Sequence, residues 1–233
     1  MKSISANIDS IRYRIALAAK RAGRDPESVR LVAVTKRKSV EVVCEALAAG
    51  QCLFGENYLQ EAQGKILDAK LKKQTVSWHF IGHLQSNKAK LAADLFDCVE
   101  TVDSVKLAGA LERRLAELDK NLSVLVQVNV GGEEQKAGVL PAEAEQICRQ
   151  IGRFPHLRLR GLMTMPPFYD DPEQVRPFFR QLRFLAEELQ AKGVFADEMT
   201  PELSMGMSGD FEVAIEEGAT LVRVGTALFG ERE

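Results

Sequence analysis

The chain has 233 residues, of which 45% are hydrophobic, so it can bury a sizeable core as one α/β barrel or as two smaller domains. Its 31 basic and 33 acidic residues give a formal net charge of -2, which excludes a strong electrostatic attraction to nucleic acid or to an anionic membrane. The four cysteines form no Cys-x-x-Cys pair and have no metal-ligand spacing, a pattern that predicts a reduced cytoplasmic protein.

The N-terminal segment is predicted to be an amphipathic helix. Its charged residues interrupt the continuous apolar stretch that a signal peptide needs. Apolar side chains recur there at helical spacing, at Ile4, Ile8, Ile11 and Ile15.

Short apolar runs, typical of strands, alternate with longer amphipathic segments along the rest of the chain. Segments such as 107–118 and 173–192 place apolar residues three or four apart, as helices do. Strands that alternate with helices predict βαβ units, and eight units in about 200 residues fit a closed (β/α)8 barrel with an added N-terminal helix. No composition break divides residues 1–233, so we expect one domain, with an open doubly wound sheet as the alternative. The predicted strands are 30–35, 52–54, 78–82, 98–101, 123–130, 159–164, 203–205 and 221–225.

The first predicted strand is followed by a lysine. Residues 31–34 are all apolar and indicate a strand covered on both faces, so Lys36 stands at the mouth of the fold, where barrels carry their catalytic groups. A desolvated lysine loses its proton more readily than an exposed one, and its neutral amine can form a Schiff base. The alternative is a lysine whose charged end reaches water.

The ends of the seventh and eighth strands carry small polar residues that are typical of a phosphate site. Ser208 precedes a helical pattern, and backbone N–H groups at such a start bind dianions together with a hydroxyl. Gly225 and Thr226 supply a second flexible backbone and another hydroxyl at the neighbouring strand end. The alternative is a pair of loops that only cap helices.

Arg223 interrupts the otherwise apolar eighth strand. Because residues alternate between the two faces of a strand, Arg223 and Gly225 share a face, and an inward Arg223 points at the site. An arginine beside a heteroaromatic nitrogen keeps that nitrogen unprotonated, since a second adjacent cation is disfavoured. An arginine that faces the helices and pairs with a glutamate is the alternative.

Two histidines, one in the third predicted strand and one directly after it, have the spacing of helical metal ligands. Four residues span about 13 Å in a strand, so His79 and His83 cannot reach one zinc ion with bonds of about 2.1 Å. We expect hydrogen-bonded wall residues and no metal site.

Five segments of the chain together resemble the pyridoxal phosphate homeostasis protein family, in the same order and spacing over essentially the whole chain. They are AVTK at 33–36, FGENY at 54–58, HFIGHLQSNK at 79–88, LSMGMS at 203–208 and VRVGTALFG at 222–230.

The resemblance implies a barrel of the alanine racemase N-terminal type, the fold type III of pyridoxal phosphate enzymes. It also implies pyridoxal 5'-phosphate (PLP) as cofactor, held covalently as an internal aldimine on Lys36. Arg223 faces the pyridine nitrogen in that arrangement. The implied phosphate ligands are Ser208, Gly225 and Thr226, and the lesser members of the pocket wall are Asn57, His83 and Met165.

The chain departs from the racemase pattern in two respects. We expect no second β domain, because the chain stops at Glu233, shortly after the eighth strand. Met165 stands where the racemase pattern has a ring-stacking histidine, so an acid/base partner is missing. The resemblance therefore implies a monomeric carrier and regulator in vitamin B6 homeostasis that delivers PLP to PLP-dependent apo-enzymes. A PLP-dependent racemase or lyase acting on a small amino acid is the alternative, and a cofactor-free phosphosugar isomerase is a distant third.

A further expectation concerns the loop after the fifth strand. Gly131 and Gly132 give Lys136 reach across the mouth of the barrel. We expect Lys136 to accept the aldehyde transiently as the cofactor leaves Lys36 and so to assist release. The alternative is a solvated surface charge.

Overall fold

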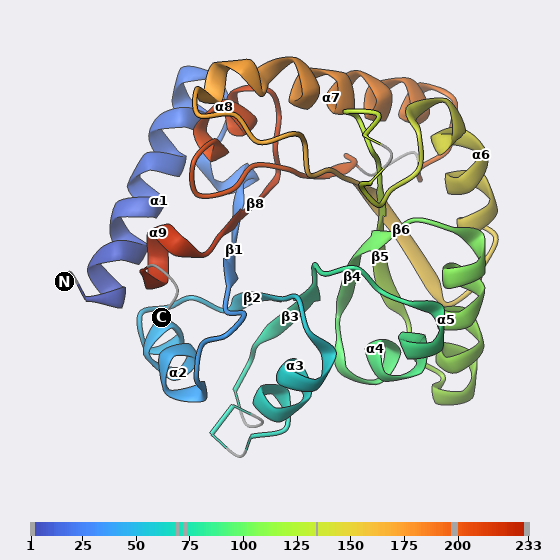
Figure 1. Cartoon of the computed structure of the whole chain (residues 1–233), viewed down its shortest axis with the longest axis horizontal. Coiled ribbons are helices and arrows are strands. Elements are labelled where there is room, and N and C mark those ends of the chain that lie inside the picture. Colours follow the sequence, from blue (N-terminus) through green and yellow to red (C-terminus); the bar gives the residue numbers. More distant parts are fainter. Residues whose placement is uncertain (1–2, 69, 72–73, 134, 197–199, 231–233) are drawn as a thin grey trace.

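Parallel strands form a closed barrel in the order of the sequence, and β8 pairs with β1 to close it (Figure 1). The computed structural model describes residues 3–68, 70–71, 74–133, 135–196 and 200–230. The predicted (β/α)8 barrel is confirmed. Its strands are β1 (Arg30–Val34), β2 (Leu53–Glu56), β3 (Ser77–Phe80), β4 (Cys98–Val102), β5 (Leu122–Gln127), β6 (Leu157–Met163), β7 (Glu202–Ser204) and β8 (Leu221–Val224).

Helices surround the barrel, as Figure 1 shows, and the N-terminal helix lies outside this ring beside the last two helices. No helix of the described ranges has the length and apolar character needed to cross a membrane. The α-helices are α1 (Ile4–Arg21), α2 (Val40–Ala48), α3 (Leu59–Ile66), α4 (Ala89–Leu95), α5 (Val105–Leu118), α6 (Pro141–Ile151), α7 (Arg176–Ala191), α8 (Phe211–Glu216) and α9 (Thr226–Phe229), with single 3-10 turns at η1 (Pro26–Ser28), η2 (Ser86–Lys88) and η3 (Pro172–Gln174).

The α-helix expected over 173–192 begins later than the apolar pattern indicates. Residues Pro172–Gln174 form a 3-10 turn, and the α-helix starts at Arg176. Pro177 is consistent with this boundary, because proline has no N–H to donate and is therefore suited to the first turn of a helix and not to its interior. Proline at the second helical position is tolerated, since that N–H has no partner within the helix.

Helix α1 is fixed by a capped start and a buried apolar face. The Ser3 hydroxyl accepts a hydrogen bond from the N–H of Ala6 at 3.2 Å and so caps the first turn. Ile8, Ile11 and Ile15 are buried where α1 packs against the neighbouring helices, which confirms the predicted amphipathic helix.

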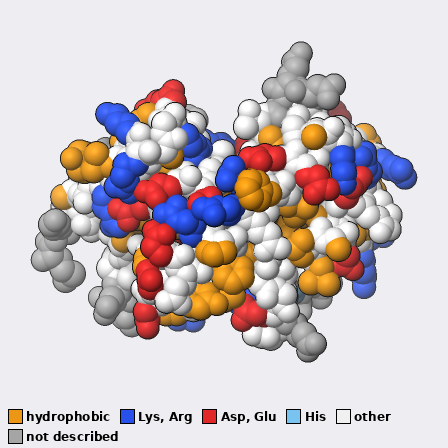
Figure 2. All heavy atoms as spheres, turned by 90° about the horizontal axis from the view of Figure 1, so that it is seen from above, with side chains coloured by type: hydrophobic (Ala, Val, Ile, Leu, Met, Phe, Trp, Pro, Cys, Tyr) orange, Lys and Arg blue, Asp and Glu red, His pale blue; other side chains and the backbone are white. Residues whose placement is uncertain are grey.

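Arginines and glutamates alternate on the face that α1, α7 and α8 share, and Figure 2 shows the interleaved charges from above. Arg14 of α1 makes two hydrogen bonds of 2.9 and 2.8 Å to Glu212 of α8. Glu217, at the end of α8, pairs with Arg176 and Arg180 of α7. These pairs tie the N-terminal helix and α7 to the end of the barrel that carries α8.

The barrel interior is divided into an apolar layer and a polar layer. Leu221 and Arg223 share the inward face of β8, two residues apart. Arg223 therefore lies one layer nearer the C-terminal ends of the strands. The apolar layer is a separate buried cluster formed by Val32, Cys98, Leu125, Met163 and Leu221.

Candidate functional site

A cavity of about 490 Å³ opens at the C-terminal ends of the strands. It lies at the end where (β/α)8 barrels carry their active sites. Seven of the eight residues predicted from the sequence line it, namely Lys36, Asn57, Met165, Ser208, Arg223, Gly225 and Thr226.

Lys36 is carried by the turn that follows β1. Thr35, the residue before it, is fully buried and points away from the cavity, because its hydroxyl donates to Glu56 Oε1 at 2.7 Å. Successive side chains of an extended segment point to opposite sides, so Lys36 faces the cavity that it lines. Arg37 then adopts a left-handed conformation with φ 61°, and its N–H donates to Glu61 Oε1 at 2.5 Å.

A buried ion-pair cluster lies behind this turn. Lys65 of α3 donates to Glu56 Oε1 at 2.7 Å, to Glu61 Oε1 at 2.6 Å and to the carbonyl oxygen of Thr35 at 2.6 Å. Glu56 is fully buried, and burial raises its pKa although Lys65 acts to lower it. The cluster therefore fixes the backbone on either side of Lys36 with charge-assisted hydrogen bonds.

Arg223 lies on the floor of the cavity and is 3% exposed. Its Nη1 donates to Ser204 Oγ at 2.6 Å, and its Nη2 donates to the carbonyl oxygen of Thr164 at 2.8 Å. Burial lowers the pKa of Arg223, whereas the charge of Glu100 acts to raise it. The arginine therefore faces the barrel interior and not the helix layer.

The loop after β7 and the start of α9 converge at the side of the cavity. Ser208 Oγ accepts a hydrogen bond from the N–H of Ala227 at 3.3 Å. Gly206 has φ +91°, and a Cβ there would lie 2.6 Å from the Cβ of Ala214, so the sharp turn requires glycine. The N–H of Arg223 donates to the carbonyl oxygen of Gly206 at 3.0 Å and holds this loop beside β8.

Asn57 presents an acceptor without a partner. Its side-chain Oδ1 is buried and has no hydrogen-bond partner among the described residues. The close approach of Gly82 holds the segment in place, because a Cβ on Gly82 would lie 2.2 Å from the carbonyl oxygen of Asn57. A buried acceptor that the fold leaves unsatisfied at the edge of a cavity is suited to a ligand.

His83 differs from the expectation, because it does not line the cavity of Lys36. Its side chain is 61% exposed, and its Nδ1 lies 3.9 Å from Asp103 Oδ2. It lines a neighbouring depression together with Lys136, which forms an ion pair with Glu133. Met165 borders both the cavity and the depression, so Lys136 lies next to the cavity but outside it.

His79 is a buried wall residue with a hydrogen bond, as expected from its place in a strand. Its Nδ1 lies 2.6 Å from Glu100 Oε1. Within the described ranges, no group of three or more histidine, cysteine, aspartate or glutamate side chains could hold a metal ion.

Several lining residues were not singled out in the sequence. Tyr169 and Asp170 reach the cavity from the loop after β6, and the Tyr169 ring stacks on Phe178 with centroids 6.2 Å apart. Asp210 reaches it from the loop after β7, and burial raises its pKa. Only their positions could have indicated these residues, since both loops directly follow strands whose ends were predicted from the sequence.

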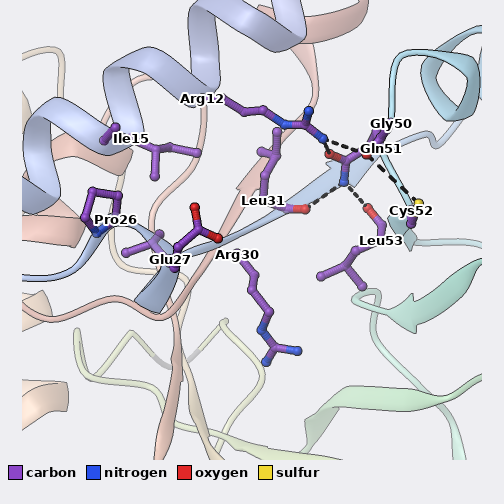
Figure 3. A pocket seen from close by; sticks show the side chains of 12 residues that line it. Arg12, Ile15, Pro26, Glu27, Arg30, Leu31, Gly50, Gln51, Cys52 and Leu53 are labelled. Carbon is purple, nitrogen blue, oxygen red and sulfur yellow. Dashed lines mark hydrogen bonds between the residues drawn. The ribbon is translucent and has the colours of Figure 1, made fainter.

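A second cavity, of about 320 Å³, lies at the opposite end of the barrel between α1 and the starts of β1 and β2 (Figure 3). The Gln51 amide donates to the carbonyl oxygens of Leu31 and Leu53, at 2.8 and 2.7 Å. Arg12 donates to the carbonyl oxygen of Gly50 at 2.7 Å, and Arg30 pairs with Glu202. These polar groups connect elements of the fold, which is a structural role.

Comparisons with known proteins agree with this architecture. The family model of the alanine racemase N-terminal domain matches residues 6–233. Two proteins named pyridoxal phosphate homeostasis protein, from Vibrio alginolyticus and Escherichia coli K12, are 46% and 42% identical to the chain. Both alignments cover 100% of the chain, with 99% and 98% of the respective relative.

Solved structures resemble the chain at two levels of identity. PipY of Synechococcus elongatus PCC7942, determined with PLP bound, is 37% identical with a TM-score of 0.82, covering 97% of this chain and 100% of PipY. A protein described as unknown from Bifidobacterium adolescentis is 38% identical with a TM-score of 0.89, covering 97% of this chain and 94% of that one. Alanine racemase of Clostridium difficile 630 is 16% identical with a TM-score of 0.75, which shows a shared fold over 99% of this chain and 57% of the racemase.

The fold, the order of its motifs and the full-length identity to these relatives lead to one conclusion. The chain belongs to the pyridoxal phosphate homeostasis protein family, within the wider alanine racemase N-terminal domain family.

Proposed function

We propose that the protein binds PLP reversibly, with Lys36 forming a Schiff base to its aldehyde, and that it regulates and delivers the cofactor in vitamin B6 homeostasis. The observation that carries the proposal is that Lys36 of the β1 turn and the buried Arg223 of β8 face one cavity. The names of the full-length relatives, and the PLP bound to PipY, support the same ligand.

The residues present fit this cofactor. The cavity, at about 490 Å³, falls within the range of about 300–1,000 Å³ that is typical of small-molecule sites. The unpartnered Asn57 Oδ1 offers an acceptor, and Arg223 offers a buried cation to a ring nitrogen. When bound, PLP supplies an aldehyde that condenses with primary amines and a ring that withdraws electrons.

Each residue of the site has a distinct part in binding. Lys36 Nζ would hold the cofactor through its aldehyde carbon, with the aldehyde oxygen lost as water. The Ser208 hydroxyl, with backbone N–H groups at Gly225 and Thr226, would hold the phosphate oxygens. Arg223 would donate to the pyridine nitrogen and would disfavour its protonation, because two adjacent cations repel.

This arrangement favours a carrier over an efficient enzyme. An unprotonated pyridine ring is a weak electron sink, and the thioether of Met165 at the cavity wall cannot transfer a proton. Tyr169 also lines the cavity, and because a phenol can transfer a proton, it favours the racemase or lyase alternative. Exchange of the Cα hydrogen for solvent deuterium across a panel of amino acids separates the two, since rates of about 1 per second or more are typical of enzymes.

The binding proposal is tested by absorbance. Wild-type protein incubated with PLP should develop the absorbance band of a Schiff base, and Lys36→Ala should not. Lys38→Ala is the matched control, because Lys38 donates to the carbonyl oxygen of Phe229 and does not line the cavity. A wild-type protein without the band, or a band that survives in Lys36→Ala, contradicts the proposal.

We further propose that the recipients are PLP-dependent apo-enzymes and that the protein acts as a cytoplasmic monomer. All four cysteines, which the structure describes, are free thiols, as a reducing compartment requires. Light scattering of the loaded and unloaded protein measures the oligomeric state, and a stable dimer in both states contradicts the monomer.

A further inference from the structure

A chain of hydrogen bonds continues from Arg223 through the barrel interior. The Ser204 hydroxyl, which accepts from Arg223, lies 2.5 Å from Glu100 Oε2, and Glu100 Oε1 lies 2.6 Å from His79 Nδ1. The four side chains come from β8, β7, β4 and β3, and none is more than 5% exposed. The polar layer beneath the cavity is therefore one connected network that spans the barrel.

The direction of each hydrogen bond follows from the donors available. The guanidinium of Arg223 carries only donor groups, so Ser204 Oγ accepts a hydrogen bond from it. The hydroxyl proton of Ser204 is then left to donate to Glu100. Burial acts to raise the pKa of Glu100, but the hydrogen bond and charge of His79 and the charge of Arg223 outweigh it and lower the pKa. Glu100 is thus an ionised carboxylate that accepts on both oxygens.

Glu100 is also the better counter-charge for Arg223. A buried guanidinium is stable only beside an opposite charge. The charge of Asp210 also acts to raise the pKa of Arg223, but less than the charge of Glu100 does, and Asp210 Oδ1 accepts a hydrogen bond from the N–H of Met207. Glu100 is fully buried and ionised, and it reaches Arg223 through a single hydroxyl.

We propose that Glu100 is a positioning residue which, acting through Ser204, holds the Arg223 guanidinium against the ring nitrogen of bound PLP. The inference rests on the proposed function and deepens it. His79 completes the arrangement by occupying the second oxygen of Glu100, which fixes the carboxylate in one orientation. The network thereby keeps the ring a weak electron sink, so the cofactor is stored without carbanion chemistry.

The ring nitrogen itself is the most direct reporter. The protein is loaded with PLP carrying 15N in the ring, and its 15N NMR resonance is compared among wild type, Glu100→Gln, Ser204→Ala and Arg223→Gln. Gln keeps the shape of Glu100 but removes the charge and replaces one acceptor oxygen with a donor. The resonance of Glu100→Gln and of Ser204→Ala should move from the wild-type position toward that of Arg223→Gln, and PLP should bind about tenfold more weakly.

A double variant separates positioning from general damage. If Glu100 acts through Arg223, adding Glu100→Gln to Arg223→Gln should produce no further shift of the resonance. Met163→Leu is the control, because Met163 is buried in the apolar layer and the change conserves volume, so its resonance and affinity should match wild type. Ser204→Ala keeps the test available if Glu100→Gln does not fold.

The outcomes distinguish this inference from the proposed function. Borohydride reduces a Schiff base and so attaches PLP permanently to the lysine that carries it. If wild-type protein treated in this way carries no PLP on Lys36, the proposed function is overturned. Wild-type protein that is labelled on Lys36, while Glu100→Gln and Ser204→Ala keep the wild-type resonance, overturns the positioning role alone. Full additivity of the shifts in the double variant also overturns it.

Discussion

Lys65 Nζ donates a hydrogen bond of 2.6 Å to the carbonyl oxygen of Thr35, the residue that precedes the proposed Schiff-base lysine. The contact joins α3 to the end of β1, and Glu56 and Glu61 balance the buried charge. The position of Lys36 is therefore set by the backbone on which it stands as well as by its own contacts.

Replacing this lysine should weaken both the fold and the site. Lys65→Met leaves two carboxylates without their cation, and removal of one partner of a buried pair costs about 3–5 kcal/mol of the free energy of unfolding. Urea unfolding measures the loss, and the rate of Schiff-base formation should fall with it. Lys70→Met is the control, because Lys70 pairs with Glu41 at the surface, and its unfolding curve should match wild type. Equal curves for both variants would show that the Lys65 cluster contributes nothing.

The charged face formed by α1, α7 and α8 should make the stability of the fold depend on pH in the acid range. Hydrogen bonds from Arg180 and Arg176 lower the pKa of Glu217 although burial opposes them. A carboxylate with a lowered pKa in the folded state stabilises the fold above its unfolded pKa of about 4.3, and this contribution is lost as the pH falls through the folded pKa.

The corresponding variant is Glu217→Gln. Its thermal midpoint should lie below that of wild type at pH 7, and the difference should shrink at pH 4 and below. Glu187→Gln removes an exposed carboxylate of α7 and is the control, and its midpoint should follow wild type throughout. A difference between Glu217→Gln and wild type that is constant with pH contradicts the assignment.

The cysteines should differ sharply in reactivity. Burial raises the pKa of Cys98 well above its ordinary value and raises the pKa of Cys148 to about 12. The thiolate is the reactive form, so these two thiols should stay unmodified by iodoacetamide at pH 8 until the protein unfolds. Cys52 is exposed and should react first, as peptide mass mapping will show. Modification of Cys98 in the folded protein would mean that the barrel interior opens.

Release of the cofactor should depend on Lys136. This lysine lines a depression that shares Met165 with the cavity of Lys36, so we expect the aldehyde to pass from Lys36 to Lys136 as the cofactor leaves. Transfer of PLP from the loaded Lys136→Ala variant to an excess of an apo-enzyme should be slower, with the starting absorbance unchanged. Lys90→Ala, an exposed substitution on α4, is the control. Equal transfer rates for wild type and Lys136→Ala would show that Lys136 is only a solvated surface charge.

The barrel was predictable because its signals are local. Each strand is a short apolar run between amphipathic segments, and the C-terminal strand ends then place seven of the eight predicted residues around one cavity. The alternation along β8 placed Arg223 and Gly225 on one face but left its direction open, and the structure shows that this face is the inward one.

The parts that were missed depend on where strands end and on how distant strands align. The third strand is predicted to reach residue 82, but β3 ends at Phe80. The alternation of side chains between the two faces of the strand therefore stops before it could turn His83 inward. The network from Arg223 to His79 needs the register of four strands in a closed barrel. The contact of Lys65 with Thr35 joins residues 30 positions apart, and no local pattern indicates it.

We propose above that Lys36 holds PLP in the cavity whose floor is Arg223. Borohydride reduction of the loaded protein, followed by peptide mass mapping, tests it most directly, because reduction makes the Schiff base permanent at the residue that carries it. Mapping should find one pyridoxyl phosphate group, on Lys36, and a lower yield at that residue in Arg223→Gln. Loaded wild-type protein that carries most of its label on a lysine other than Lys36, or that carries no label, would contradict this assignment.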